Sequence, residues 1–270
     1  MSGLFDEETV RFATTQFLAA ALAMARILTV LFVLPVFTRL ELGVLLRGAI
    51  ALVLALPLAG PLTATMTTDP VLAMTGTRLV VLIAKEMLAG LILGLVLGLP
   101  FYAAEVAGDV LDLQRGATLA QVVDPTSGAT ASITATLLGL VMIAVFFAAG
   151  GQQLMMQAIY DSYGLWPAGA MLPAFSAETP ARLLGLIDTV VSMGVVLAGP
   201  LIIALFVTDV VLAVVSRATP QLNAFDLSLA VKNLVFTLLL TLYAGFLIAY
   251  MRDDLARLLD VGDMLSGLAR

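Results

Sequence analysis

Long apolar runs alternate with short polar intervals along this chain, and each run has the length of a membrane-spanning helix. The runs cover residues of about 16–38, 43–63, 71–104, 131–160, 186–216 and 227–250. A helix needs roughly 20 apolar residues to cross the hydrocarbon core of a bilayer. The pattern predicts an all-α membrane protein with about six apolar segments. The intervals are too short for a soluble domain, so we expect a single membrane-associated unit over residues 1–270.

Prolines fall inside or at the ends of several of these runs. They are Pro35, Pro57, Pro61, Pro100 and Pro200. Proline removes a backbone donor and clashes with the preceding helical turn, so it kinks or ends a helix. We therefore expect tilted and broken helical hairpins, and the run 71–104 is long enough to be one.

The most polar interval of the chain, from 105 to 132, reads EVAGDVLDLQRGATLAQVVDPTSGATAS. Glu105, Asp109 and Asp112 are spaced i, i+4, i+7 and share one face of a helix, and Arg115 follows Asp112 by one turn and can pair with it. Gly116 and the later Asp-Pro and Ser-Gly steps then end the helix in a loop.

This interval cannot lie bare in lipid. Over residues 100–120 the strongly apolar side chains contribute about −3 kcal/mol to insertion, and the four charges oppose it by about 10 kcal/mol. The segment must be enclosed by protein or must line an aqueous path. The alternative is a solvated loop between two spans, and the charge spacing does not separate these two interpretations.

Other charges lie inside the apolar runs, where a lipid-facing helix excludes them. Arg26, Arg47, Lys85, Glu86 and Asp209 are expected to face protein or water. The adjacent Lys85 and Glu86 point about 100° apart on a helix, so we expect them to make separate contacts with neighbouring subunits rather than a pair.

Composition supports the membrane class and excludes most enzyme classes. Hydrophobic residues make up 61% and charged residues 12% of the 270 residues, against roughly 45–50% and 25% in soluble domains. The chain has no cysteine and no histidine, which removes thiol nucleophiles, Ser-His catalysis, disulfides and ligation through these residues. We expect no enzyme activity and no catalytic, cofactor-binding or metal-binding residues.

Charge gives no sign of nucleic-acid or nucleotide binding. The net charge is −6, the 13 basic residues form no run, and no GxxxxGK[ST] loop is present. Assigning basic residues to alternate sides of the six segments gives six on one side and five on the other, so the positive-inside rule selects no orientation. This balance fits chance, and it equally fits segments that are not ordinary lipid-embedded spans.

Five motifs in order along the chain resemble the FliR/SctT family of type III secretion export apparatus subunits. They are D-x-Q-R-G-A-T at 112–118, D-P-x-x-G at 124–128, F-x-x-G-G at 147–151, S-Y-x-x-W-P at 162–167 and R-x-x-P-Q-x-N-x-F at 217–225. Gln-Arg-Gly after Asp112 and the Gly150-Gly151 pair resemble the injectisome branch (SctT, also YscT, SpaR or HrcT), associated with virulence. Flagellar FliR members more often have Asn-Gly-His in place of Gly-Gly, so the flagellar branch is the second assignment.

The resemblance implies a structural and gating subunit of the export gate in the bacterial inner membrane, partly raised toward the periplasmic side. Its implied partners are SctR, SctS and SctU subunits, membrane lipid and unfolded secretion substrates that cross the channel. A loop of about 112–130 is implied to close the channel as a plug. The matching plug or gating residues are Asp112, Gln114, Arg115, Gly116, Asp124, Pro125 and Gly128.

Two further regions receive structural roles. The motif residues Arg217, Pro220, Gln221, Asn223 and Phe225 are interpreted as an assembly contact or hinge after the fifth segment. Leucines at helical spacing in the stretch of about 251–270 predict a short amphipathic tail on the membrane or on a partner.

Two other function classes remain open from the residues. A solute transporter also has broken helices and buried charge, but it usually has recognisable inverted halves. An intramembrane aspartyl protease needs two facing carboxylates, for which Asp109 and Asp209 are the candidates. The signature expected of such a protease is absent.

Overall fold

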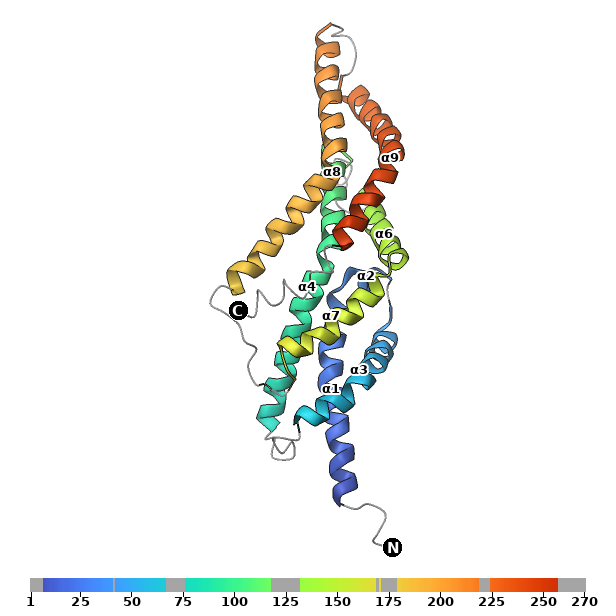
Figure 1. Cartoon of the computed structure of the whole chain (residues 1–270). Coiled ribbons are helices and arrows are strands. Elements are labelled where there is room, and N and C mark those ends of the chain that lie inside the picture. Colours follow the sequence, from blue (N-terminus) through green and yellow to red (C-terminus); the bar gives the residue numbers. More distant parts are fainter. Residues whose placement is uncertain are drawn as a thin grey trace. The chain divides into compact units, whose positions relative to one another are not determined.

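Helices account for the secondary structure of the part of the chain described by the computed structural model, which comprises residues 7–40, 42–66, 76–117, 132–168, 170, 179–218 and 224–256 (Figure 1). They are α1 (Glu7–Val33), α2 (Pro35–Arg39), α3 (Val44–Met66), α4 (Gly76–Gln114), α6 (Ile133–Ala148), α7 (Gly151–Leu165), α8 (Thr179–Ala218) and α9 (Ala224–Ala256). Within these residues, five helices are long and apolar enough to cross a membrane, and α6 with α7 counts as a sixth, broken span. The predicted all-α class with about six apolar segments is confirmed.

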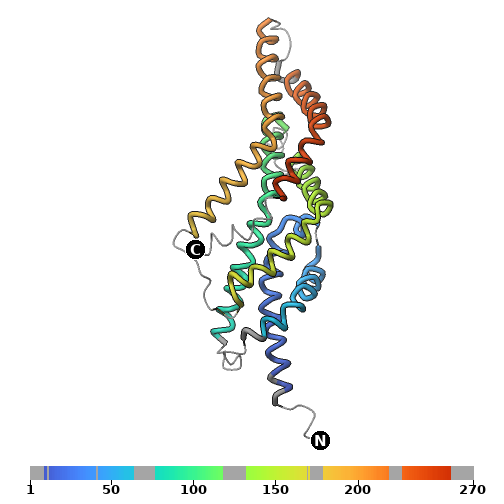
Figure 2. Tube along the Cα trace, in the orientation of Figure 1, coloured from blue at the N-terminus to red at the C-terminus, as the bar shows by residue number. Residues whose placement is uncertain are grey.

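The chain divides into two compact units. One contains α1, α2, α3, the part of α4 up to Gly98, and α7. The other contains α4 from Leu99 onward, α6, α8 from Leu184 and α9. Figure 2 traces α4 as one continuous helix, and its residues belong to the first unit up to Gly98 and to the second from Leu99.

In the first unit, α1 packs along α3 and against α4. The side chains of Leu22, Ile27 and Leu31 in α1 are fully buried. Gly90 of α4 lies so close to α1 that an added Cβ atom would be 2.4 Å from the carbonyl oxygen of Arg26. Small residues allow this kind of close helix approach in membrane proteins.

The prolines have two different effects. Leu34 has an extended ψ of 123° before Pro35, and this break separates α1 from α2, because proline disfavours the helical conformation of the residue before it. Pro100, in contrast, lies inside α4, which is continuous over 39 residues. From Gly76 onward, the run 71–104 is therefore one helix and not a broken hairpin. Neighbouring groups in a membrane protein can satisfy the carbonyl that such a proline leaves free.

The F-x-x-G-G motif breaks the fourth apolar run between α6 and α7. Gly150 has φ 76°, a left-handed conformation that glycine adopts without steric cost. Gly151 lies against the ring of Phe146, where an added Cβ atom would clash with ring carbons. The two glycines therefore have separate roles, one in the turn and one in close packing.

In the second unit, α6 packs against both α9 and α4. The rings of Phe101 and Phe146 meet edge to face with centroids 5.5 Å apart. Gly108 of α4 lies directly against the backbone of Ala135 in α6, where an added Cβ atom would be 2.3 Å from both the Cα and the nitrogen. This close approach brings the polar end of α4 beside the first turn of α6.

Candidate functional site

The polar end of α4 terminates in a glycine-dependent cap. Gly116 has φ 77°, its N–H donates to the carbonyl of Leu113 (3.1 Å), and the N–H of Ala117 donates to the carbonyl of Asp112 (3.0 Å). This pair of bonds is the Schellman arrangement, which satisfies carbonyls that the helix end leaves free. The predicted end of the helix at Gly116 is confirmed.

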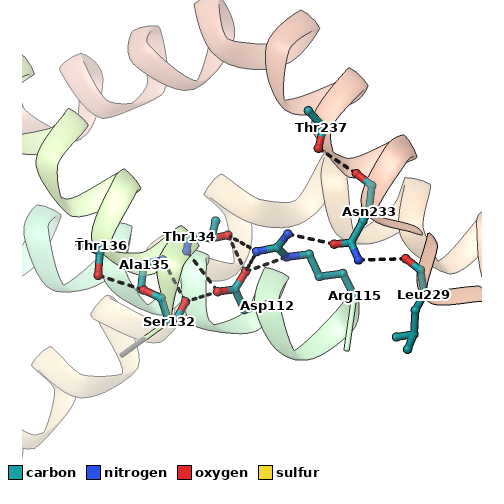
Figure 3. Close-up of polar contacts among 9 residues, drawn as sticks. All are labelled: Asp112, Arg115, Ser132, Thr134, Ala135, Thr136, Leu229, Asn233 and Thr237. Carbon is teal, nitrogen blue, oxygen red and sulfur yellow. Dashed lines mark hydrogen bonds and ion pairs between the residues drawn. The ribbon is translucent and has the colours of Figure 1, made fainter. Parts of the chain in front are cut away.

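The carboxylate of Asp112 is the centre of a buried hydrogen-bond network (Figure 3). One oxygen accepts from the Arg115 Nε (2.8 Å) and from the Thr134 hydroxyl. The other accepts from the Ser132 hydroxyl (2.6 Å) and from the Thr134 backbone N–H (3.1 Å). Ser132 is also the N-cap of α6, where its hydroxyl accepts from the Ala135 N–H (3.0 Å).

Arg115 extends this network to α9. Its Nη2 lies 2.7 Å from an Asp112 oxygen and 3.1 Å from the Thr134 hydroxyl, and its Nη1 donates to the Asn233 side-chain oxygen at 3.0 Å. The guanidinium also lies 4.6 Å from the ring centroid of Phe236. Asp112, Arg115, Ser132, Thr134 and Asn233 are called the Asp112 network below. The predicted pairing of Asp112 with Arg115 is confirmed.

A second ion pair lies beside the Asp112 network. Lys232 of α9 donates to the carbonyl of Gln114 (3.1 Å), and its Nζ is 2.5 Å from an Asp209 oxygen in α8. Lysine near the last carbonyls of α4 complements the negative end of the helix dipole. Asp209 is thus paired with an ammonium group, which does not fit the role of a facing catalytic carboxylate.

Every charge in the Asp112 network has an opposite charge or a hydrogen-bond partner. The Asp112 residue is 2% exposed, and a buried carboxylate is stable only when it is paired and fully hydrogen-bonded. Five donors supply that environment here, from Arg115 just after α4 and from Ser132 and Thr134 at the start of α6. The prediction that charges of this interval must be sheltered is confirmed for Asp112.

The three carboxylates on one face of α4 differ in their exposure to solvent. Asp112 is buried, Glu105 is half-buried and Asp109 is exposed. Helical spacing places them on one face, as predicted, but only Asp112 lies where α6 begins. Glu105 instead lies near Gly139, in the middle of α6.

The Asp112 network holds together the two flanks of segment 118–131. Ala117 ends the described part on one side, and Ser132 begins it on the other. The predicted plug residues Asp112, Gln114, Arg115 and Gly116 lie at this base. The remaining three, Asp124, Pro125 and Gly128, lie outside the described residues.

The predicted assembly or hinge motif is described only at its edges. Arg217 is exposed in the last turn of α8, and Phe225 lies in the first turn of α9. Pro220, Gln221 and Asn223 lie outside the described residues, as does most of the predicted amphipathic tail after Ala256.

The first unit contains a second buried cluster, built around Arg26 of α1. The Arg26 Nε donates to Glu86 of α4 at 2.6 Å, and neither side chain is exposed to solvent. Its other nitrogens donate to the Ser162 hydroxyl and to the Trp166 carbonyl, both at 2.8 Å. The guanidinium lies 3.8 Å from the centroid of the Tyr163 ring. The S-Y-x-x-W-P motif therefore surrounds a buried arginine.

Lys85 completes this cluster and corrects a prediction. Its Nζ is 2.6 Å from Glu86 Oε1 and donates to the carbonyls of Pro167 (2.7 Å) and Ala168 (3.0 Å). The expectation that Lys85 and Glu86 make separate contacts with neighbouring subunits rather than a pair is wrong. Lys85 bends toward the carbonyls after α7, and Glu86 meets it there because Glu86 also pairs with Arg26, which donates to another of these carbonyls. Arg26, Lys85, Glu86, Ser162 and the carbonyls of 166–168 are called the Arg26 cluster.

Sequence reasoning named Arg26 and Glu86 as buried charges but missed that they pair, since they are 60 positions apart. The available signal was that each lies in the middle of an apolar run and needs an opposite charge. Among the described residues, no group of three or more His, Cys, Asp or Glu side chains could hold a metal ion. Both clusters bury charge between packed helices.

Comparisons with known proteins agree over most of the chain. Residues 17–258 match the family described as bacterial export proteins, family 1. The chain is 32% identical over 244 residues to the Yop proteins translocation protein T of Yersinia pestis, covering 90% of this chain and 92% of that protein. It is 32% identical over 226 residues to the surface presentation of antigens protein SpaR of Salmonella typhimurium, covering 83% and 82%. It is 31% identical over 228 residues to the flagellar biosynthetic protein FliR of Pectobacterium carotovorum, covering 82% and 84%.

Proposed function

Because this chain belongs to the bacterial export proteins, family 1, the FliR/SctT family of type III export apparatus subunits, we propose that it helps to form and close a channel for unfolded proteins. It is an integral membrane protein of an export complex, and we place it in the bacterial inner membrane. In this proposal the subunit is structural and gating rather than enzymatic, and it needs no cofactor.

The injectisome branch is the proposed assignment, and the flagellar branch is the alternative. The Gln-Arg-Gly sequence after Asp112 and the Gly150-Gly151 pair favour the first. The match to the translocation protein of Yersinia pestis, which covers 90% of this chain, supports the same choice. A flagellar relative of nearly equal identity keeps the second assignment open.

The proposed partners are SctR, SctS and SctU subunits, with part of the assembly raised toward the periplasmic side. Exposed apolar side chains cover much of the long helices, as at Phe206 of α8 and Leu242 of α9. Surfaces of this kind fit lipid or other membrane subunits. The motif residues from Arg217 to Phe225 remain proposed as an assembly contact or hinge.

The gating role rests on one observation. Both flanks of segment 118–131 are attached to one buried network. A loop that closes a pore must keep its base fixed while its tip changes position. The Asp112 network supplies such a base, since Asp112 joins the end of α4 to the start of α6 and Arg115 joins both to α9. We therefore propose that the residues between the two flanks, 118–131, form the seal.

The sealing role is tested by replacing residues 119–130 with a Gly-Ser linker of equal length, which leaves the whole Asp112 network intact. If the loop seals the channel, cells that carry the assembled complex become permeable to small ions when secretion is inactive. The matched control replaces residues 171–178 in the same way. Membranes that stay tight with the first linker would show that the loop is a passive connector.

A further inference from the structure

Helix α7 has two chemically different faces. Met155 and Ile159 in the helix, and Trp166 just past its end, are buried together with Ser162, at the spacing of one helix face. The exposed positions of α7 are Gln152, Gln153, Gln157, Asp161 and Gly164. An apolar face against the protein and a polar face outward is the pattern of a helix that meets water.

Helix α3 of the same unit does not share this pattern. From Val44 to Thr63, every exposed residue of α3 is apolar, including Leu45, Val53 and Leu56. These side chains suit contact with lipid, whereas glutamine amides and a carboxylate in lipid would have no hydrogen-bond partners. The polar face of α7 therefore does not belong against hydrocarbon.

The position of α7 is fixed by the Arg26 cluster. Arg26 from α1 and Lys85 from α4 hold the carbonyls that follow the helix. With 15 residues, α7 is about 22 Å long, shorter than the hydrocarbon core of roughly 30 Å. Because buried charge holds the end of α7, its exposed glutamines lie at a defined place in the unit.

A membrane surface is a poor occupant for this face. Helices that lie on membranes usually carry Lys and Arg on their polar side, which attracts anionic headgroups. The exposed face of α7 carries Asp161 and no basic residue, so anionic headgroups would be repelled. Glutamine amides both donate and accept hydrogen bonds, which suits water and the backbone of an extended polypeptide of any sequence.

We propose that the Gln153–Gln157–Asp161 face of α7 lines the water-filled path along which an unfolded polypeptide crosses the membrane. The inference rests on the proposed export function and adds the surface of this chain that the polypeptide meets. It concerns a part of the chain separate from the proposed seal.

The absence of native cysteine allows a direct test. Single cysteines at Gln153, Gln157 and Asp161 in the full chain, assembled in its export complex in permeabilised cells, are treated with a membrane-impermeant maleimide. The expected rates exceed that of a V53C control on α3 by about tenfold or more, because only a hydrated thiol ionises and reacts. An I159C variant on the buried face of α7 should react as slowly as V53C.

Two outcomes overturn the inference. Labelling of Q157C no faster than V53C in the complex would place this face against lipid or a partner. Labelling without crosslinks between a photoreactive group at Gln157 and a stalled export substrate would leave a hydrated surface that the polypeptide does not meet. Ion leakage with the 119–130 linker but no α7 labelling would remove this inference alone, so its failure is distinguishable from failure of the proposed seal.

Discussion

Asp112 and Thr134 lie 22 positions apart, and the carboxylate of the first accepts both the backbone N–H and the hydroxyl of the second. Thr134 stands in the first turn of α6, two residues after the N-cap Ser132. The carboxylate therefore satisfies an N–H that the helix leaves free, and its negative charge complements the positive end of the helix dipole. One side chain near the end of α4 thus contacts the first turn of α6 and neutralises Arg115.

Replacement of Asp112 by asparagine is expected to destabilise the protein strongly. D112N keeps the shape but removes the charge that neutralises Arg115, and its amide group points donors at Ser132 or Thr134. Breaking a buried ion pair from one side costs about 3–5 kcal/mol. The midpoint of thermal unfolding of the full chain in mild detergent should fall clearly, and the amount of assembled complex should fall with it.

The control for this change lies one turn earlier on the same helix. Asp109 is exposed, and exposed substitutions usually change stability by about 0.5 kcal/mol or less. D109N should therefore unfold close to the unmodified chain. Equal unfolding midpoints for D112N and D109N would show that the Asp112 network does not hold α4 and α6 together.

Arginine at position 115 is expected not to be replaceable by lysine. Arg115 contacts Asp112, Thr134 and Asn233 at once through different nitrogens, and a single ammonium cannot reproduce this planar set of donors. Each lost hydrogen bond to a charged group contributes about 1.5–3 kcal/mol. R115K should lower the unfolding midpoint, whereas R217K at the exposed end of α8 should not.

A double-mutant cycle tests the link from Arg115 to α9. If Arg115 and Asn233 interact as described, R115K and N233A together should destabilise the chain less than the sum of the two single changes. Simple additivity would mean that the hydrogen bond between them contributes nothing to stability.

Local spacing predicted the parts of the Asp112 network that lie within one helix, but not its partners. Asp112 and Arg115 are three positions apart, so helix geometry alone pairs them. Thr134 and Asn233 are 22 and 118 positions from their partners. Their contacts depend on how α6 and α9 pack, which the apolar pattern does not encode because it fixes the number of helices and not their neighbours.

The Arg26 cluster illustrates a different limit. The sequence predicted that Arg26, Lys85 and Glu86 are sheltered, and they are buried. The predicted arrangement was wrong because it treated the two adjacent side chains as rigid and as fixed in direction on an isolated helix. The carbonyls at 167 and 168 accept hydrogen bonds from Lys85 and so hold its ammonium group beside Glu86. Nearby polar groups determine where the charged head of a long side chain lies more than the direction in which the side chain leaves the helix.

Alanine at position 108 is expected to separate α4 from α6. The new Cβ atom would meet backbone atoms of Ala135 at 2.3 Å, and backbone cannot move aside as a flexible side chain can. Overpacking of this kind costs about 1–3 kcal/mol. The matched control is G185A in α8, where an added Cβ atom has open space and alanine favours the helix. A G108A chain that unfolds no earlier than G185A would contradict the close approach of α4 and α6.

Replacement of Glu86 by glutamine is expected to disrupt the first unit. Arg26 and Lys85 both contact the Glu86 carboxylate at 2.6 Å, and without its charge two buried cations lie beside each other with only neutral acceptors. The cost is about 3–5 kcal/mol, as for other buried pairs broken from one side. E86Q should therefore lower the unfolding midpoint and expose the S-Y-x-x-W-P region, seen as faster protease cleavage after α7. D188N, which neutralises an exposed carboxylate on α8, should leave both measurements unchanged. If E86Q matches D188N, the carboxylate does not hold the end of α7 against α1 and α4.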